Sequence, residues 1–287
     1  WIRNMSDIEL AFIGGSGLYK IPGFKNFKWL KVKSSFGNPS DSICVGTLNN
    51  KKIAFLPRHG RKHNISPSNI NYRANIESLK ILKVKNIISL SAVGSLRNDY
   101  KPGEFVIVNQ FIDKTFLRKK TFFDDDLVVH VPLANPVCEN LSKISAKILK
   151  KLKIKFHYSG TYICMEGPQF STLAESELYR SWGCDVIGMT NMPEAKLARE
   201  AGICYCSLAM ITDFDCWHPD HEKVTIDQII KTLGDNSSKA TKVIEEFSNE
   251  KLIVCNDSVK MSAKNSIVTD LSLVNNKTKK KLTNILE

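Results

Sequence analysis

The fold of this chain is decided by residues 160–217, GTYICMEGPQFSTLAESELYRSWGCDVIGMTNMPEAKLAREAGICYCSLAMITDFDCW. Short apolar runs alternate here with polar segments that have the character of helices. Polar groups follow three of the apolar runs directly: EGPQF at 166–170, GMT at 188–190, and the pair Asp213 and Asp215. Because open α/β sheets bind ligands at the carboxyl ends of their strands, this alternation predicts an α/β fold with a ligand site at that edge.

The length and composition of the chain favour one domain. Its 287 residues are 43% hydrophobic, which is sufficient for a buried core and argues against disorder. No apolar run approaches the about 18 residues that span a bilayer, and the N-terminal residues lack a secretory apolar segment. We therefore expect a single cytoplasmic domain over residues 1–287, in which about 251–287 form a C-terminal extension that sequence patterns do not place.

Neither the net charge nor the cysteines predict a nucleic-acid or metal site. The net charge is +12, which can indicate nucleic-acid binding, but the lysines are scattered apart from clusters at 150–155 and 279–281. We interpret them as a solvated surface that attracts small anions such as phosphate. Eight cysteines with neither a CxxC pair nor zinc-ligand spacing predict free thiols and no metal.

Small or basic residues follow three further predicted strands. The strand 8–13 ends in GGSG, the hairpin 42–56 ends in PRHG, and the strand 86–90 ends in SAVGS, read as a turn. Taken singly, each motif fits a tight turn or a surface arginine as well as an anion site. A guanidinium and free backbone N–H groups are nevertheless what an oxyanion requires, and their recurrence predicts one shared anion site.

The remaining elements are predicted from periodicity and capping residues. A strand is expected over 104–112, followed by a long polar loop from Asp113 to Asp126 that is a candidate functional loop. A buried central strand is expected over 203–211. Helices are expected to begin at Ser66-Pro67, Asn135-Pro136, Thr172, Pro193 and Thr225, where capping residues or proline precede apolar stripes.

At this point the motifs GGSGLY, LPRHG, SAVGSL, NQFIDKT, GTYICMEGPQFST, DVIGMTNMPEAKLAREAGICY and TDFDCW resemble the 5'-methylthioadenosine phosphorylase branch of the purine nucleoside phosphorylases. The resemblance runs from about residue 10 to about residue 247. It implies a mixed twisted central sheet flanked by helices, a homotrimer, and no metal or organic cofactor. The implied reaction converts 5'-deoxy-5'-methylthioadenosine and inorganic phosphate into adenine and 5-methylthioribose 1-phosphate.

The resemblance also implies roles for individual residues. Phosphate binding is implied for Ser16, Arg58, His59, Ser91, the backbone at Ala92, and Thr190. Substrate binding is implied for Phe170 stacking on the purine, Met189 at the ribose, Asp213 and Asp215 at the base, and His130 from the neighbouring subunit. Ser171 and Ile226 are implied to line the pocket and set specificity. Many members carry Thr where this chain has Ser16 and Ser91, so the hydroxyl is kept.

The paired acids suit this chemistry. Adenine is a poor leaving group unless N7 is protonated or hydrogen-bonded, and a buried Asp213 can serve as the general acid. Asp215, two residues on, can accept from the 6-amino group, which disfavours 6-oxo purines. The alternatives are a purine nucleoside phosphorylase acting on 6-oxo nucleosides or methylthioinosine, and a basic nucleic-acid-binding protein of the same fold. Without the family context, Asp213 and Asp215 fit a solvated turn and Phe170 fits the core.

Overall fold

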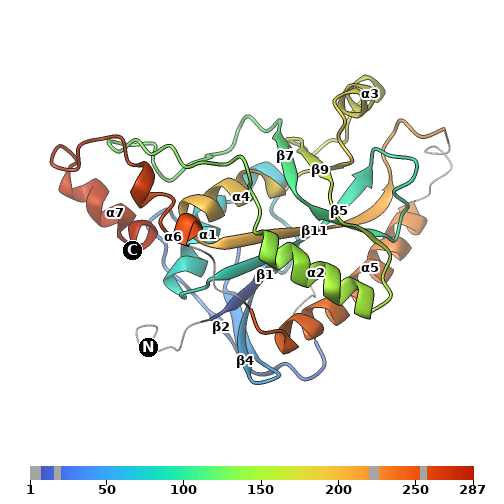
Figure 1. Cartoon of the computed structure of the whole chain (residues 1–287), viewed down its shortest axis with the longest axis horizontal. Coiled ribbons are helices and arrows are strands. Elements are labelled where there is room, and N and C mark those ends of the chain that lie inside the picture. Colours follow the sequence, from blue (N-terminus) through green and yellow to red (C-terminus); the bar gives the residue numbers. More distant parts are fainter. Residues whose placement is uncertain (1–7, 16–20, 220–225, 253–256) are drawn as a thin grey trace.

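The computed structural model describes residues 8–15, 21–219, 226–252 and 257–287, with the side chains of 226–230 and 257 outside the described set. It contains a mixed central sheet with helices on both faces (Figure 1). The strands are β1 Leu10–Gly14, β2 Lys25–Leu30, β3 Ile43–Leu48, β4 Lys51–Pro57, β5 Asn86–Ser95, β6 Phe105–Val108, β7 Gln110–Asp113, β8 Phe156–His157, β9 Thr161–Cys164, β10 Val186–Gly188 and β11 Cys204–Phe214. The helices are α1 Tyr72–Ile81, α2 Glu139–Lys151, α3 Leu173–Ser181, α4 Asn191–Glu200, α5 Ile226–Asn249, α6 Asp257–Lys260 and α7 Asn276–Leu286.

The sheet is mixed and forked, which confirms the predicted fold class. Its main path runs β2-β3-β4-β1-β5-β10-β9-β7, while β11 pairs with β5 and β6, and β6 pairs with β8. The central pairs β4-β1, β1-β5 and β5-β11 are parallel, whereas β10 runs antiparallel to β5. The carboxyl ends of β4, β1, β5 and β11 therefore lie at one edge, where ligands of such sheets bind.

Strand β5 is the branch point of the sheet, and the branch leaves an opening. Along one side β5 pairs with β11 over nearly its whole length. On its other side β1 pairs with Asn86–Ser89, and β10 pairs with Gly94 and Ser95. On the side opposite β11, the stretch from Leu90 to Val93 therefore has no strand paired with it among the described residues. Ser91 and Ala92 occupy this opening.

Alternation along the strands produces two cores, one on each face of the sheet. In β1, Leu10 and Phe12 pack with residues of α2 and α5, while Ala11 and Ile13 pack with residues of α1, α4 and α7. Successive side chains of a strand point to opposite faces, so a strand buried on both faces is apolar throughout. Figure 1 shows α1 and α4 on one side of the sheet and α2 and α5 on the other.

Two predicted helix starts are wrong. Ser66 precedes only a 3-10 turn at Pro67–Asn69 and makes no capping bond, whereas the side chain of Asn71 accepts from Ala74 N and begins α1 at Tyr72. Helix α2 begins at Glu139, four residues after Asn135, because the backbone N–H of Cys138 is bonded to Tyr205 O of β11 at 2.8 Å. A local cap at Asn71 thus sets the start of α1, and a tertiary contact sets the start of α2.

Two predicted strand boundaries also differ. The stretch from Ser91 to Ser95, expected as a turn, continues β5 because β11 pairs with it as far as Phe214. The strand expected over 104–112 divides at Asn109, which exchanges hydrogen bonds with Gly160 and so directs β7 onto β9. The hairpin turn in 42–56 and the capping box of Thr172 and Glu175 are confirmed.

The cysteine prediction holds for six residues and fails for one. Cys44, Cys138, Cys164, Cys184, Cys206 and Cys216 carry free thiols. Cys204, at the start of β11, is disulfide-bonded, so the prediction of free thiols throughout is wrong. Within the described ranges, no helix has the length and apolar character needed to cross a membrane.

The C-terminal extension, which the sequence did not place, packs against the α1 face of the sheet. Ala263, Val274, Leu282 and Ile285 are buried in the same core as α1 and α4. The side chain of Asn284 in α7 donates to Glu77 of α1 at 3.0 Å. The extension is therefore integrated into the core through this face. The capping box expected at Thr225 and Gln228 lies outside the described residues.

Candidate active site

Three elements meet at the hydroxyl of Ser89 in β5. This oxygen accepts from Arg58 Nη2 at 2.6 Å and from Asn191 Nδ2 at 3.1 Å, and it donates to Glu194 Oε1 at 2.7 Å. A serine hydroxyl has one donor and two acceptor sites, so Ser89 is fully used. The end of β4, the middle of β5 and the start of α4 are thereby fixed against one another.

Arg58, which follows β4, is completely enclosed and forms a bidentate pair with Glu194. Its Nε and Nη2 donate to the Glu194 carboxylate at 2.8 and 3.0 Å, and its Nη1 donates to Leu90 O at 3.1 Å. Burial alone would lower the pKa of Arg58, but the Glu194 carboxylate outweighs this effect and raises the pKa. The fork of the guanidinium is directed at Glu194, so a second N–H on Nη1 is the donor left for a ligand.

Ser91 and Thr190 flank this network and supply two buried hydroxyls. Both side chains are 6% exposed, and in the described part of the chain neither Ser91 Oγ nor Thr190 Oγ1 has a hydrogen-bond partner. Burying a hydroxyl without a hydrogen-bond partner costs about 1–3 kcal/mol of folding free energy. A ligand that bonds to the hydroxyl would remove this penalty. Ser91 lies next to Leu90, which Arg58 contacts, and Thr190 precedes Asn191. Ala92, the next residue in the opening of β5, is exposed.

His59 is neutral at pH 7. Burial, followed by the charge of Arg58, lowers its pKa to about 4. Its Nδ1 lies 2.9 Å from Ile65 O, and since a carbonyl can only accept, Nδ1 carries the proton. Nε2 is therefore the acceptor of this ring, a suitable partner for an acidic P–OH group.

The two acids at the carboxyl end of β11 differ in environment. Asp213 lies in the strand after a bulge at Thr212, is partly buried, and accepts from Thr212 Oγ1 at 2.6 Å. Asp215 follows the strand end and is 7% exposed, and it accepts from Ser171 Oγ at 2.6 Å. Its backbone N–H donates to Ser95 O at 3.0 Å, which holds Asp215 at the end of β5.

The EGPQF loop closes the other side of the site. Gly167 has φ +68°, and a Cβ there would meet Met189 Sδ at 2.5 Å, so the loop packs onto Met189 only with glycine at this position. Phe170, expected either to stack on a purine or to be core, is 83% exposed. The core alternative for Phe170 is thus wrong. Ser171, next to it, is buried against Asp215.

Glu166 and Arg118 join this loop to the predicted functional loop at 113–126. Glu166 accepts from the backbone of Phe116 and Leu117 and from Arg118 Nε, and Arg118 Nη2 returns a bond of 2.8 Å to Glu166 O. Phe116 and Leu117 are 74% and 71% exposed. Exposed aromatic and aliphatic side chains are thus carried by two loops that are joined through Glu166.

Three expected site residues are not joined to this network within the described chain. Ser16 lies outside the described residues, as does the side chain of Ile226 at the start of α5. The segment of His130 pairs with the C-terminal extension, through its own N–H to Ser266 O and the bridge between Val129 and Ile267. His130 itself is exposed.

Sequence reasoning missed the residues that hold the site together. Ser89, Asn191 and Glu194 have no local pattern that marks them as a buried network, although Asn191 and Glu194 belong to the NMPEAK motif. Glu166 and Arg118 were likewise assigned no role. In the described ranges, no group of three or more His, Cys, Asp or Glu side chains is arranged to hold a metal ion.

Comparison with known proteins shows the family to which this chain is similar. The model of the phosphorylase superfamily matches residues 9–249. An S-methyl-5'-thioadenosine phosphorylase of Rhodospirillum rubrum is 56% identical over 236 residues, which cover 82% of this chain and 80% of the relative. One of Thermosynechococcus vestitus is 46% identical and covers 96% of both chains.

The solved structures that resemble this chain are also methylthioadenosine phosphorylases. A methylthioadenosine phosphorylase from an Antarctic soil metagenomic library superposes with a TM-score of 0.93 at 43% identity, covering 99% of this chain and 100% of its own. The methylthioadenosine phosphorylase of Schistosoma mansoni in complex with adenine has a TM-score of 0.80 at 35% identity, covering 85% and 91%.

Proposed function

This chain belongs to the phosphorylase superfamily, and from this premise we propose that it cleaves 5'-deoxy-5'-methylthioadenosine with inorganic phosphate, releasing adenine and 5-methylthioribose 1-phosphate. The reaction is that of a pentosyltransferase in methionine and purine salvage. The observation that carries the proposal is the pair of buried hydroxyls of Ser91 and Thr190, which have no partner among the described residues and lie near Arg58 at the opening of β5. An anion satisfies both hydroxyls, and the family uses phosphate as its nucleophile.

Phosphate binds at this opening in the proposed mechanism. Ser91, Thr190 and the remaining Nη1 proton of Arg58 donate to its oxygens, together with the backbone at Ala92, and Ser16 is assigned to the same group. His59, neutral with Nε2 as acceptor, accepts a hydrogen bond from a P–OH group of the monoprotonated or diprotonated anion. Glu194 and Ser89 hold the Arg58 guanidinium in place before the ligand binds. Because this donor does not have to reorganise during the reaction, it stabilises the charge of the transition state.

The purine occupies the side of the acids. Asp213 protonates or hydrogen-bonds N7 as the glycosidic bond breaks, while Asp215, oriented by Ser171, accepts from the 6-amino group. Phe170 stacks on the base and Met189 contacts the ribose. Ile226 and the His130 of a neighbouring subunit are assigned to the methylthio end. Departing adenine leaves a cationic sugar, which the bound phosphate attacks at C1'.

The assembly is proposed to be a homotrimer of one phosphorylase domain per chain. Support comes from the exposed apolar side chains Phe116, Leu117 and Phe170 on the two loops joined by Glu166, which a neighbouring subunit and the substrate would cover. We further propose a cytoplasmic enzyme with phosphate as co-substrate, no metal or organic cofactor, and neither nucleic acid nor membrane as a partner.

The deciding experiment measures adenine release from methylthioadenosine with and without phosphate. We expect release that requires phosphate and is unchanged by a chelator. Inosine and methylthioinosine, assayed in parallel, should react far more slowly because their 6-oxygen faces the Asp215 acceptor. A preference for inosine would contradict the roles of the acids, and phosphate-independent release would contradict phosphorolysis.

A further inference from the structure

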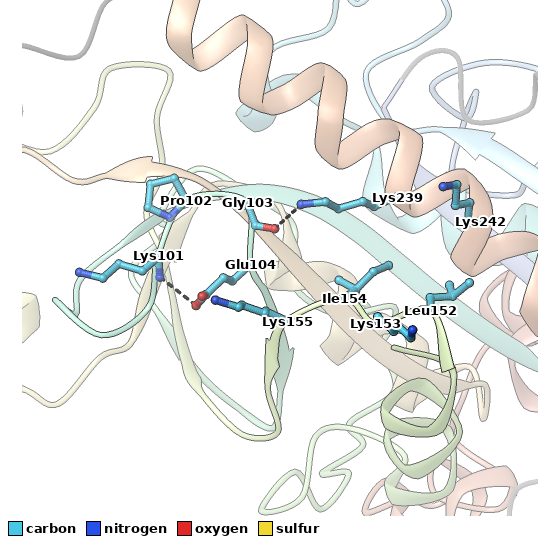
Figure 2. Close-up of a pocket in the computed structure, with 10 residues that line it drawn as sticks. All are labelled: Lys101, Pro102, Gly103, Glu104, Leu152, Lys153, Ile154, Lys155, Lys239 and Lys242. Carbon is cyan, nitrogen blue, oxygen red and sulfur yellow. Dashed lines mark hydrogen bonds between the residues drawn. The ribbon is translucent and has the colours of Figure 1, made fainter. Parts of the chain in front are cut away.

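A second concave site lies away from the candidate active site. It is a cavity of about 550 Å³ between the turn from β5 to β6, the segment after α2, and helix α5 (Figure 2). Its lining consists of Lys101, Pro102, Gly103, Glu104, Leu152, Lys153, Ile154, Lys155, Lys239 and Lys242. Half of these residues are lysines, and one is acidic. The volume falls within the about 300–1,000 Å³ typical of small-ligand pockets.

None of the five lining lysines lies within ion-pair distance of a described acidic residue. Lys155 nevertheless interacts with Glu104: despite burial, hydrogen bonds from His157 and Lys101 and the charge of Lys155 lower the pKa of that carboxyl. By contrast, Lys143, Lys147 and Lys151, on the α2 helix next to the cavity, pair with Glu139, Glu250 and Glu246 at 2.7, 2.8 and 2.5 Å. The chain therefore neutralises the lysines on one face of α2, while the neighbouring cavity has five lysines and one acidic residue in its lining.

The one carboxylate of the lining is already engaged. Glu104 accepts from the backbone N–H of Lys101 at 3.1 Å and pairs with His157 Nε2 at 2.8 Å. His157 and Lys150 line a smaller adjoining cavity that shares Glu104, Ile154 and Lys155 with the first. Glu104 thus engages both His157 and the charge of Lys155, and the lining retains an excess of positive charge.

The lysines reach the cavity from three separate segments. Lys239 and Lys242 are three residues apart on α5 and so share a face of the helix, and Lys239 Nζ also donates to Gly103 O at 2.7 Å. Lys153 and Lys155 follow α2, and Lys101 lies in the turn before β6. Figure 2 shows the α5 lysines across the cavity from Lys101 and Lys155. An anion held by all three segments must span several ammonium groups.

We propose that this cavity binds a small anion that carries two or more linked phosphate groups. Ammonium groups act as point charges toward phosphate, and five of them around one cavity suit a linear polyphosphate better than one orthophosphate. Leu152, Ile154 and Pro102 offer an apolar wall that accommodates an attached organic group. The site is separate from the residues of the proposed function, so it does not depend on that function.

The test compares two triple variants that remove equal charge. K153M/K155M/K242M removes three lysines of the cavity, and K277M/K279M/K280M removes three exposed lysines of α7. Binding of inorganic tripolyphosphate, ATP and orthophosphate to the intact protein and both variants is measured by titration calorimetry. We expect one tripolyphosphate per chain, weakened roughly tenfold or more in the cavity variant and unchanged in the α7 variant.

The other measurements distinguish a polyphosphate site in the cavity from phosphate binding at the active site and from nonspecific charge attraction. Orthophosphate should bind the cavity variant as it binds the intact protein, and adenine release should be equal in all three proteins, which also shows that the variants are folded. Tighter binding of ATP than of tripolyphosphate would indicate that the apolar wall contacts the organic group of the ligand. Equal losses in both variants, no loss in the cavity variant, or binding of single-stranded RNA but not of tripolyphosphate would overturn the proposal.

Discussion

The proposed phosphate end of the candidate site consists of side chains that are buried and hydrogen-bonded, whereas the proposed nucleoside end is bordered by side chains that face solvent. Arg58 and Glu194 are 2% and 1% exposed, but Phe116 and Phe170 are 74% and 83% exposed. The first end is built on β5 and α4 within the core. The second consists of two loops tied together by Glu166 and Arg118.

This difference follows from the groups that each end must bind. An anion can leave water only if donors are already oriented toward it, and fixing those donors requires the rigid centre of the sheet. A purine and a methylthio group need apolar contact, which loops can provide once the ligand or a neighbouring subunit covers them. Mutations should therefore separate into changes of phosphate affinity, stability and nucleoside affinity.

The largest effect is expected from Asp213→Asn. An amide cannot donate a proton to N7 as a general acid, so kcat should fall about 10²–10⁴-fold while KM for phosphate changes little. Steady-state kinetics with methylthioadenosine measure both values. The control is Asp99→Asn at a 63% exposed surface carboxylate. An unchanged kcat in Asp213→Asn would contradict the proposed role of Asp213 as the acid that protonates the purine.

Glu194→Ala tests whether the phosphate end is fixed by the core. It leaves the Arg58 charge buried and unpaired, and the free energy of unfolding should fall by about 3–5 kcal/mol. Removal of Asp99, the exposed partner of Arg97, should cost about 0–1 kcal/mol. Urea unfolding compares the two. If Glu194→Ala does not fold, Glu194→Gln serves instead, and it should raise KM for phosphate more than KM for the nucleoside.

The anchor of the 113–126 loop should depend on pH. Glu200 of α4 accepts from Thr121 Oγ1 and Phe122 N, and burial raises its pKa from 4.5 to about 7. The folded state thus binds the proton more tightly, so this contribution is complete below pH 4.5 and is lost as pH rises through 7. It amounts to at most about 3 kcal/mol. Unfolding free energies of Glu200→Gln should lack this decline, and parallel profiles for the two proteins would contradict it.

Ser91→Ala and Ser89→Ala separate ligand binding from scaffold. Ser91 Oγ has no partner in the described chain, so its loss should leave stability nearly unchanged while KM for phosphate rises. A hydrogen bond to a charged group contributes about 1.5–3 kcal/mol, or roughly ten- to hundredfold. Ser89→Ala breaks three bonds and should lower stability as well. Equal destabilisation of both variants would argue against a ligand at Ser91.

The smallest effect is expected from Phe170→Ala. Loss of stacking should raise KM for methylthioadenosine about two- to tenfold, corresponding to about 0.5–1.5 kcal/mol. The melting temperature should not change because the side chain is exposed. Leu178→Ala, at a 45% exposed residue of α3, is the control. A lower melting temperature without a change in KM would show that Phe170 packs against protein instead.

Local sequence patterns predicted those elements whose own residues decide them. The hairpin over 42–56, the Thr172–Glu175 capping box and the apolar strand β11 were all correct, because turn residues, caps and alternation act over a few positions. Predictions failed where another element intervened: β11 extended β5 through Ser95, and a bond from Cys138 to Tyr205 delayed α2.

By itself, the sequence determined the class of fold, the family and the residue types at the strand ends, since these depend on local pattern and on motifs in order. The tertiary structure alone decided that Arg58 directs its fork at Glu194, that Ser91 and Thr190 are buried without a partner among the described residues, and that lysines from three segments line a second cavity. The physical reason is that burial and hydrogen-bond pairing depend on residues distant in sequence, which meet only when the sheet and its helices assemble.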